Sequence, residues 1–288
     1  MPYGGVQFQP VGSVGRVLLP CGQCIECRLS KAREWALRCV HESKLYRHSS
    51  FVTLTYDDDH LNSYSLDYRD FQLFAKRTRQ EIGPFRFFMA GEYGEENWRP
   101  HFHALLFGVS FSDRQFLKKS PSGQTIYRSK ILSDLWKNGL VSVGDVTFES
   151  AGYVARYVVK KRTGVDAQEH YMRVDPRTGE VVQLVPEFCR MSNGGGRGSE
   201  KHGGIGARFY WKFKEEMKVR DSVVLGGVEH SMPRYYDKLA ERDDSAEFEV
   251  RKLARQGLRE RGENAPPRLV ARRTVAEARL AFKRRGKV

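Results

Sequence analysis

The sequence lacks long apolar runs and has few cysteines. No segment approaches the roughly 18 consecutive apolar residues of a membrane-spanning helix. Residues 1–15 also lack the charged and apolar regions of a signal peptide. We therefore expect a soluble intracellular protein with no membrane partner. Five cysteines, an odd number, argue against a disulfide framework and leave metal binding or free thiols.

Acidic residues are in deficit, and no phosphate-binding GxxxxGK[ST] run is present. The 49 Lys and Arg residues outnumber the 35 Asp and Glu residues, which gives a net charge of +14. This excess indicates a polyanionic partner, with nucleic acid favoured over an anionic membrane. A solvated basic surface is the alternative, but interleaved aromatic residues favour base stacking. The missing GxxxxGK[ST] run means that no built-in helicase is predicted.

Hydrophobic periodicity predicts an α+β fold. Helices are predicted over 28–46, 67–81, 127–137 and 151–161, the last capped by Ser150, and strands over 51–56, 85–92, 101–109 and 140–148. Residues 110–126 are predicted to form a loop. This order of elements favours an antiparallel sheet with helices packed on one face.

Composition divides the chain into four segments. They are an N-terminal cysteine-containing segment and helix (1–48), a core (49–165), a glycine-rich and aromatic accessory segment (166–240) and a basic tail (241–288). From Arg251 onward the tail has 13 basic and three acidic residues, and Ala265-Pro266-Pro267 interrupts it. We expect this tail to be partly helical and partly disordered.

The pair His101 and His103 flanks Phe102 in an apolar strand. Alternate side chains of a strand share a face, so the two imidazoles point the same way and Phe102 points to the other side. Such a pair can chelate a metal, although strand histidines also form plain polar patches. Glu92 ends the preceding strand and is the expected third ligand, with Glu95 or Glu96 as alternatives. Two imidazoles and one carboxylate leave open positions on a divalent cation, Mg²⁺ or Mn²⁺, for phosphate chemistry.

Two tyrosines, Tyr153 and Tyr157, lie four residues apart in a predicted helix and share one face of it. A free phenol has a pKa near 10, so only about 0.1% is ionised at pH 7, and attack on phosphorus needs a base, a cation or a metal nearby. Lys160 and Arg156 are candidate cations. An aromatic stripe packed on the sheet is the alternative.

A run of cysteines, Cys21, Cys24 and Cys27, precedes the first helix. Three thiolates with Cys39 or His41 would complete a tetrahedral zinc site, but the usual two separated CxxC pairs are absent. Reduced, partly buried thiols are the alternative.

In order along the chain stand Thr53-Leu54-Thr55-Tyr56, Gly91-Glu92-Tyr93-Gly94, Arg99-Pro100-His101-Phe102-His103 and Tyr153-Val154-Ala155-Arg156-Tyr157. Together they resemble the HUH endonucleases, named for histidine, hydrophobic residue, histidine. The two tyrosines, the cysteine run and Pro233-Arg234-Tyr235-Tyr236-Asp237-Lys238 make the sequence similar to the replication initiators of the Microviridae, gokushovirus branch. The resemblance covers residues 20–165 well and 185–240 loosely. The glycine-rich stretch 193–204 is longer than the family leads us to expect.

The resemblance implies a palm-like core and rolling-circle replication in the cytoplasm of a host cell. One tyrosine would cut single-stranded origin DNA, forming a 5′-phosphotyrosine and a 3′-hydroxyl that primes a polymerase, and the strand would later be rejoined. His101, His103 and Glu92 would hold the metal, Tyr153 and Tyr157 would be nucleophiles, and Lys160 would assist them. Host helicase and polymerase are the implied partners. The DNA contacts predicted from charge are Arg99, Arg156, Lys161 and Arg162.

Two other functions stay open. The chain is alternatively a non-catalytic protein that binds single-stranded nucleic acid through its basic tail and aromatic residues. A plasmid initiator or transposase with the same HUH chemistry is the other alternative.

Overall fold

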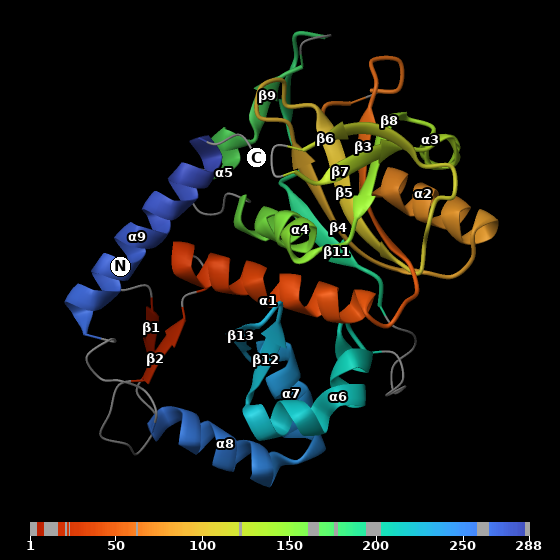
Figure 1. Ribbon diagram of the computed structural model, residues 1–288. Helices are drawn as coiled ribbons and strands as arrows, with labels where there is room; N and C mark the ends of the chain where they lie inside the picture. Colours follow the sequence, from red (N-terminus) through yellow and green to blue (C-terminus); the bar gives the residue numbers. More distant parts are fainter. Residues whose placement is uncertain are drawn as a thin grey trace.

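A computed structural model describes residues 5–8, 17–20, 22, 24–61, 63–120, 123–160, 167–175, 178–193, 203–257 and 265–285. Its centre is a seven-stranded antiparallel sheet (Figure 1). From one edge to the other the strands are β11 (Phe188–Met191), β4 (Arg86–Tyr93), β5 (Pro100–Phe107), β3 (Ser49–Tyr56), β8 (Gly139–Asp145), β7 (Thr125–Arg128) and β6 (Gln115–Lys119). The predicted α+β fold with an antiparallel sheet is confirmed.

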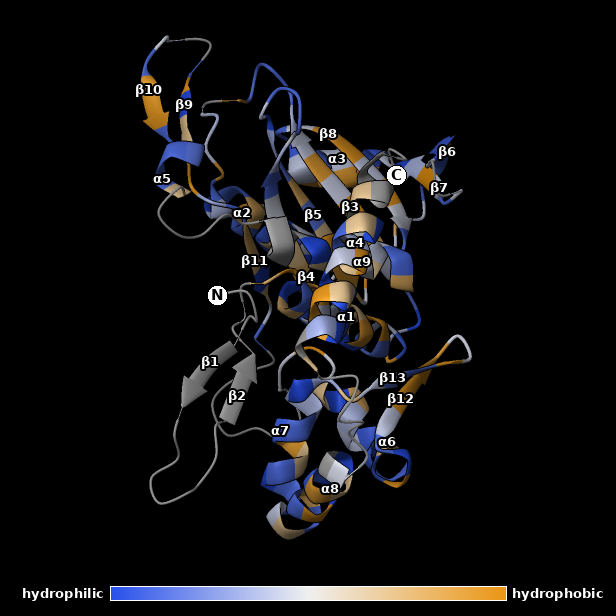
Figure 2. Cartoon of the chain, turned by 90° about the vertical axis from the view of Figure 1, so that its left-hand side faces the viewer, coloured by the Kyte–Doolittle hydropathy of each residue, from blue (hydrophilic) through white to orange (hydrophobic). Residues whose placement is uncertain are grey.

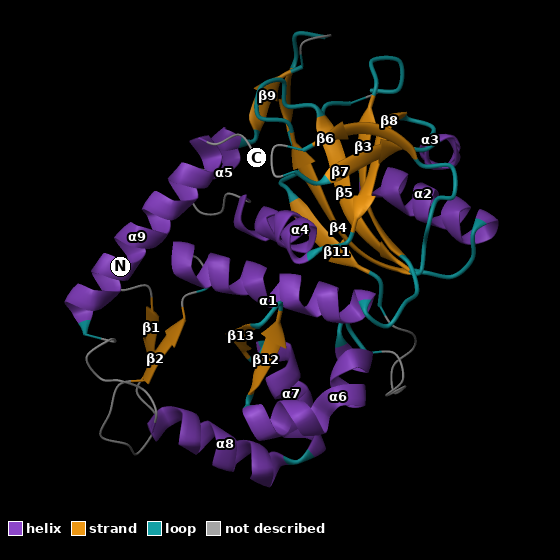
Figure 3. Cartoon of the chain, viewed as in Figure 1, coloured by secondary structure: helices purple, strands orange, loops and turns teal. Residues whose placement is uncertain are grey.

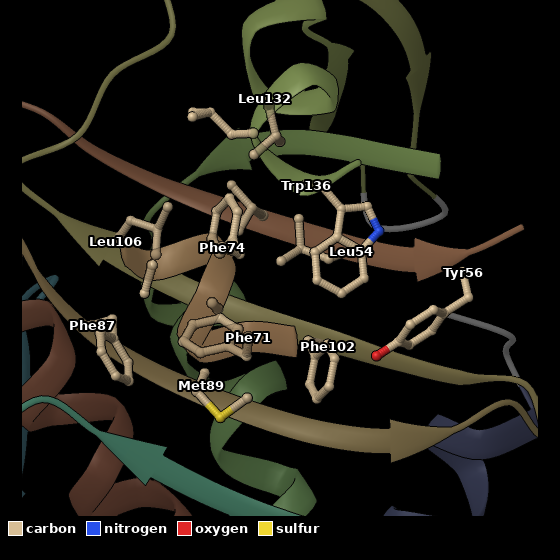
Figure 4. Packing of buried hydrophobic residues seen from close by; sticks show 14 of the residues in the cluster. Leu54, Tyr56, Phe71, Phe74, Phe87, Met89, Phe102, Leu106, Leu132 and Trp136 are labelled. Atoms are coloured by element: carbon tan, nitrogen blue, oxygen red, sulfur yellow. The ribbon is translucent and has the colours of Figure 1, made fainter. Parts of the chain in front are cut away.

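One face of the sheet is covered by α2 (Tyr68–Glu81) and α3 (Lys130–Trp136). Asp67 caps α2 by accepting a hydrogen bond from the backbone N–H of Arg69, and Ser129 caps α3 in the same way through Leu132. The apolar side chains between the helices and the sheet form the largest core, part of which Figure 4 shows: Leu54, Phe71, Phe74, Met89, Phe102, Leu106 and Trp136.

The opposite face is covered by α1 (Ile25–Ser43) and α4 (Phe148–Lys160). Small residues of both helices, such as Ala36 and Ala155, pack on Phe88 and Leu105 of the sheet. The order of elements predicted helices on one face of the sheet, and this was wrong because helices lie on both faces. Short apolar strands do not reveal whether both of their faces are buried, and this is why the second layer escaped the sequence pattern.

A smaller unit packs on the far side of α1 and contains α6 (Ala207–Arg220), β12 (Ser222–Leu225), β13 (Val228–Ser231), α7 (Arg234–Asp243) and α8 (Ser245–Gly257) (Figure 3). Its core joins Leu37 of α1 to Tyr210, Tyr236 and Phe248. Ala36 belongs to the core beneath the sheet and its neighbour Leu37 belongs to the core of the smaller unit, so α1 contributes to both cores.

The junction between α1 and α6 uses glycines of the glycine-rich region. Gly206 begins α6 with a φ of +85°, a conformation that favours glycine, and its N–H donates to the buried Glu42 carboxylate at 2.7 Å. Glu42 also accepts from Arg86 at 3.0 Å, and Arg86 reaches the carbonyl of Gly203 at 2.8 Å. Residues 194–202 of this stretch lie outside the described part of the chain.

The remaining elements are β1 (Gly5–Phe8), β2 (Val17–Pro20), α5 (Ala167–His170), β9 (Met172–Val174), β10 (Val181–Gln183) and α9 (Pro266–Arg285). Figure 2 shows the β9–β10 hairpin projecting from the molecule, with exposed Val174 and Val181. The tail is helical in α8 and α9, and Pro266 and Pro267 of the expected break are the first residues of α9. The expected partial disorder falls on residues outside the described ranges.

Two local predictions were wrong, and one strand was not predicted. Residues 110–126 contain β6 and the start of β7, and the exposed side chains of β6 give no hydrophobic alternation. The edge strand β11 was missed because four residues carry little periodic signal. The cap of α4 is Thr147 and not Ser150. The backbone N–H of Ser150 donates to the Thr147 hydroxyl at 3.1 Å, and the Thr147 N–H donates back to the Ser150 hydroxyl at 2.8 Å.

Candidate metal centre

The strand register brings the predicted metal ligands together. In the β4–β5 pair, Glu92 lies directly opposite His101, and Ala90 lies opposite His103. Glu92, His101 and His103 therefore share the face covered by α1 and α4, while Phe102 is buried in the core on the other face. The predicted two-sided arrangement of this strand is confirmed.

Three ligand atoms converge between the strands. The Nε2 atoms of His101 and His103 lie 2.6 and 3.0 Å from Oε1 of Glu92. One ligand atom from each residue lies within 4.8 Å of the others, and this is the one such group of three among the described residues. Glu95 and Glu96, the alternatives to Glu92, are exposed in the loop that follows β4.

Each imidazole is oriented through its other nitrogen. Nδ1 of His103 lies 2.9 Å from the hydroxyl of Thr53, its register partner on β3, and Nδ1 of His101 lies 3.1 Å from the carbonyl oxygen of Arg99. Outer contacts of this kind fix the ring orientation of metal-binding histidines. Both Nε2 atoms are thereby directed at one point, which is the arrangement that a metal-binding site needs.

The electrostatics favour an ionised carboxylate in this cluster. Glu92 is almost fully buried, at 3% exposure. Burial raises the pKa of Glu92, but the hydrogen bonds and charges of His101 and His103 outweigh it and lower the pKa to about 2. An ionised oxygen ligand is therefore present at every pH at which a metal would bind.

Tyr153 of α4 lies against the histidine cluster. Its ring meets that of His103 edge-on, with centroids 5.0 Å apart, and Phe51 supports it from the side. The guanidinium of Arg156 lies 5.4 Å from the centre of the Tyr153 ring. Of the predicted nucleophiles and cations, Tyr153 and Arg156 are thus brought to the metal centre.

The other predicted residues around α4 are less fully described. Tyr157 and Lys160 belong to α4, and the backbone of Tyr157 lies one helical turn beyond Tyr153, but their side chains are outside the described part. Lys161 and Arg162 lie outside the described residues altogether. Arg99 stands beside the cluster, where its guanidinium donates to the carbonyl of Tyr56 at 2.9 Å and pairs with Asp58.

The predicted zinc site is not assembled around Cys39. Cys27 and Cys39 belong to one continuous helix, α1, and twelve residues at about 1.5 Å each separate them by roughly 18 Å along its axis. Cys39 is fully buried, and burial raises the pKa of its thiol far above the usual value. His41 is excluded for the same geometric reason. Cys24 and Cys27 are half-buried, and Cys21 lies outside the described residues.

Comparison with known proteins identifies the family. A family model described as replication-associated protein ORF2/G2P matches residues 49–162. The replication-associated protein ORF2 of Spiroplasma virus 4 is 30% identical over 277 residues, which cover 91% of this chain and 78% of that protein. The chain belongs to the family of phage replication-associated proteins. The family resemblance recognised in its motifs is thereby confirmed.

Two further relatives come from other phages. The replication-associated protein VP4 of Bdellovibrio phage phiMH2K is 36% identical over 227 residues, or 75% of this chain and 65% of that protein. The replication-associated protein ORF4 of Chlamydia phage 1 is 28% identical over 246 residues, or 81% of this chain and 56% of that protein. The chain thus spans less than two thirds of the length of these two relatives. No solved structure matches it.

Proposed function

We propose that this phage replication-associated protein is a metal-dependent endonuclease that nicks and rejoins single-stranded DNA at a rolling-circle origin. The observation that carries the proposal is the convergence of Glu92, His101 and His103 next to the phenol-bearing helix α4. Membership of the family supports a role in phage DNA replication. No helix of the described part is long and apolar enough to cross a membrane.

The donor set fits a divalent cation such as Mn²⁺ or Mg²⁺. The two Nε2 atoms and the ionised Glu92 oxygen would hold it and leave coordination positions open. A cation bound there supplies Lewis-acid polarisation of a phosphodiester. The buried carboxylate and the two oriented rings keep these ligands in place before DNA binds.

In the proposed reaction a tyrosine of α4, Tyr153 or Tyr157, attacks the phosphorus of the scissile phosphodiester. The new bond joins the phenolic oxygen to phosphorus, and the bond from phosphorus to the 3′ oxygen breaks. The phenol loses its proton and the departing 3′ oxygen gains one, so no water is consumed and the phosphodiester energy is kept in the 5′-phosphotyrosine link. The second tyrosine would repeat the attack at the copied origin and free a new 3′-hydroxyl. That hydroxyl would then attack the first phosphotyrosine, so that a phosphodiester forms, the bond from phosphorus to the first phenol breaks, and the closed strand is released.

Arg156 and Lys160 of α4 supply positive charge to this step. The Arg156 guanidinium lies over the Tyr153 ring, where it stabilises a phenolate and contacts a phosphate oxygen in the proposed complex. Arg99, beside His101, would hold the backbone of the DNA strand. Host helicase and polymerase are the partners that such an initiator requires, because the sequence carries no GxxxxGK[ST] run.

The decisive test is formation of a covalent protein–DNA adduct. Labelled single-stranded oligonucleotides that tile the replicon are incubated with the protein and Mn²⁺ or Mg²⁺, and adducts are counted after denaturing electrophoresis. We expect an adduct with one oligonucleotide, its loss in Tyr153→Phe/Tyr157→Phe, and its loss with retained DNA binding in His103→Ala.

Tyr127→Phe is the matched control, since Tyr127 is a half-buried tyrosine of β7, away from the cluster. It should form the adduct at the wild-type rate. An adduct of normal yield in the double tyrosine variant would disprove the assignment of the nucleophiles. Absence of any adduct from the wild type, with DNA binding intact, would favour the non-catalytic alternative.

A further inference from the structure

A pocket of about 510 Å³ lies outside the candidate metal centre, between the C-terminal end of α1, helix α6 and strand β12. Its walls combine aromatic rings with cations. Phe209 and Phe213 of α6 supply the rings, and Lys44, Lys212 and Arg220 supply the positive charges.

The aromatic wall is built on a pair of stacked rings. The Phe209 ring lies on that of His41, with centroids 4.2 Å apart and planes 12° apart, and the Phe213 ring lies 4.5 Å from Phe209 with its plane tilted by 42°. His41 is buried, and its Nδ1 lies 3.0 Å from the hydroxyl of Tyr236. Burial lowers the pKa of His41 to about 3, so its ring stays neutral. The wall thus offers uncharged aromatic rings at the pocket.

Helix α6 changes direction at this wall. Phe213 has non-helical backbone angles, φ −120° and ψ 18°, within α6. Kinks usually come from proline, glycine or an inserted group, and neither proline nor glycine occurs in Ala207–Arg220. Helix α6 contacts α1 and β12, and its kink lies where Phe209 and Phe213 meet.

The cations of α6 are divided between its two sides. Lys214 and Lys218 are neutralised on one side by Asp243 of α7, at 2.7 and 3.2 Å. Lys212 and Arg220 line the pocket on the other side, and neither forms an ion pair with any residue that the structure describes. The exposed Lys44 of α1 joins them, while Glu216 is the one acid of the lining. The pocket therefore keeps an excess of positive charge next to flat rings.

We propose that this pocket binds one nucleotide unit of single-stranded DNA, with the base stacked on Phe213 and Phe209 and the phosphate on Lys44, Lys212 and Arg220. Aromatic rings next to cations are the usual means of holding single strands without reading their sequence. The choice of DNA as the polyanion rests on the proposed function. The pocket would be a second contact for the strand that is nicked.

The pocket and the metal centre lie towards opposite ends of the same strands. Glu42 and Tyr46 are sequence neighbours of the pocket residues at the end of α1. They contact Arg86 and Phe107, which lie six residues from Glu92 and His101 respectively. Six residues at about 3.3 Å each give a separation of roughly 20 Å. At the stacked spacing of about 3.4 Å per nucleotide, a strand would need about six nucleotides beyond the nick to reach the pocket.

The test measures binding of the full chain to a labelled dT15 oligonucleotide by fluorescence anisotropy, with EDTA present so that the metal centre takes no part in catalysis. The variant Lys44→Glu/Lys212→Glu should bind about 10-fold more weakly than the wild type, with a salt dependence flatter by about 1.4 log units per log unit of salt. Phe213→Leu should bind about 5-fold more weakly with an unchanged salt dependence.

The matched control is Arg69→Glu/Lys76→Glu, which makes the same charge change on exposed residues of α2, on the other side of the sheet. It should stay within about 3-fold of the wild type, and equal losses in both double variants would overturn the proposal. Thermal unfolding of each variant identifies any loss of fold. The proposal would also be overturned if the pocket bound free dTMP but the pocket variants bound dT15 with the affinity of the wild type.

A second measurement separates this proposal from the proposed function. Single-turnover adduct formation at low salt uses origin oligonucleotides that end three or fifteen nucleotides from the nick. At a protein concentration that does not saturate the DNA, the pocket variants should form the adduct with the long substrate more slowly than the wild type does. Their rate with the short substrate should equal that of the wild type. If the wild type forms no adduct with either, the nicking function fails, and the dT15 measurements still decide whether the pocket binds DNA.

Discussion

At the scale of single residues, the metal centre depends on which atom of each side chain faces inward. Thr53 and the Arg99 carbonyl engage the Nδ1 atoms, so both Nε2 atoms meet the Glu92 carboxylate. The cluster and the fold therefore depend on the same hydrogen bonds, and the charge of Glu92 influences stability as well as the proposed metal binding.

This link predicts a pH dependence for the metal-free protein. The pKa of Glu92 is lowered to about 2 in the folded chain, against 4.5 for an ordinary glutamate. A lowered folded-state pKa stabilises the fold above pH 4.5, and this stabilisation is lost as the pH falls towards 2. Its full size is roughly 3 kcal/mol, of which about 2 kcal/mol is lost by pH 3.

Urea unfolding of the wild type and of Glu92→Gln, both with EDTA, measures the effect. The free energy of unfolding of the wild type should fall more steeply than that of Glu92→Gln between pH 5 and pH 3. Parallel curves for the two proteins would show that the hydrogen bonds from His101 and His103 do not hold the carboxylate in its charged form.

Single residues of the cluster could be predicted from the sequence better than its hydrogen-bond partners. His101, His103 and Glu92 could be predicted because strand periodicity is a local rule and β4 and β5 are joined by a short loop. Thr53 could not be assigned its hydrogen bond with His103, because the register of β3 against β5 joins residues fifty positions apart. Hydroxyls in strands are common, and nothing in the sequence marks this one.

At the scale of elements, the junction of α1 with α6 and α7 depends on a backbone position that only glycine tolerates well. A methyl group built on Gly206 would lie 2.5 Å from the hydroxyl of the buried Tyr236, and the φ of +85° adds strain. The hydroxyl of Tyr236 is itself held by His41. A shift of Gly206 would break its hydrogen bond to Glu42, and a shift of Tyr236 would break its hydrogen bond with His41.

We expect Gly206→Ala to lower the free energy of unfolding by about 3 kcal/mol, because left-handed strain of roughly 1–2 kcal/mol is added to the steric conflict. Gly227→Ala is the control, since Gly227 has a φ of +77° in the turn between β12 and β13 with open space around it. The free energy of unfolding of Gly227→Ala should fall only by the left-handed strain of roughly 1–2 kcal/mol. Equal losses in chemical denaturation of the two variants would show that Tyr236 moves aside freely.

Elements also show where sequence patterns fail. The strand β6 has five exposed residues, so binary patterning cannot distinguish it from a loop, and pairing with β7 defines it instead. Conversely, the helix over 67–81 was predicted to within one residue, because Asp67 caps it and Phe71, Phe74 and Ala75 mark its buried face. Caps and periodicity are local signals, whereas pairing with a distant edge is not.

At the scale of the whole molecule, the excess of positive charge is concentrated in the last helix. Residues 266–288 contain eight basic residues and one acidic residue, and the described side chains of α9 are mostly exposed. By contrast, α8 is part of the smaller unit, where Arg255 pairs with Asp237 at 2.8 Å and Phe248 is buried. We therefore expect the outer part of the basic tail, from Pro266, to be removable without unfolding the rest of the chain.

Truncation after Ala265 should lower the net charge from +14 to +7 and weaken binding to single-stranded DNA at low salt. The slope of log affinity against log salt should become flatter by about 0.7 for each phosphate that the shortened chain no longer neutralises. Adduct formation under single-turnover conditions at low salt should stay near the wild-type rate.

Truncation after Arg251 instead removes Arg255 and should lower the unfolding temperature. The truncation after Ala265 should flatten the salt slope without lowering the unfolding temperature, and this difference separates the two truncations. An unchanged slope in the protein without α9 would show that this helix does not contact DNA.

Helix α1 packs in two cores, and this limits where the chain can be divided into fragments that fold. Ala36 faces the sheet and Leu37 faces the smaller unit, so a cut anywhere between α1 and β3 would expose two apolar surfaces and not one. A fragment that starts at Ser49 would also leave Phe88 and Leu105 without the helix that covers them. The shortest stretch that keeps both faces of the sheet covered runs from Ile25 to Met191, and any swap of modules between relatives has to transfer α1 with both of its neighbours.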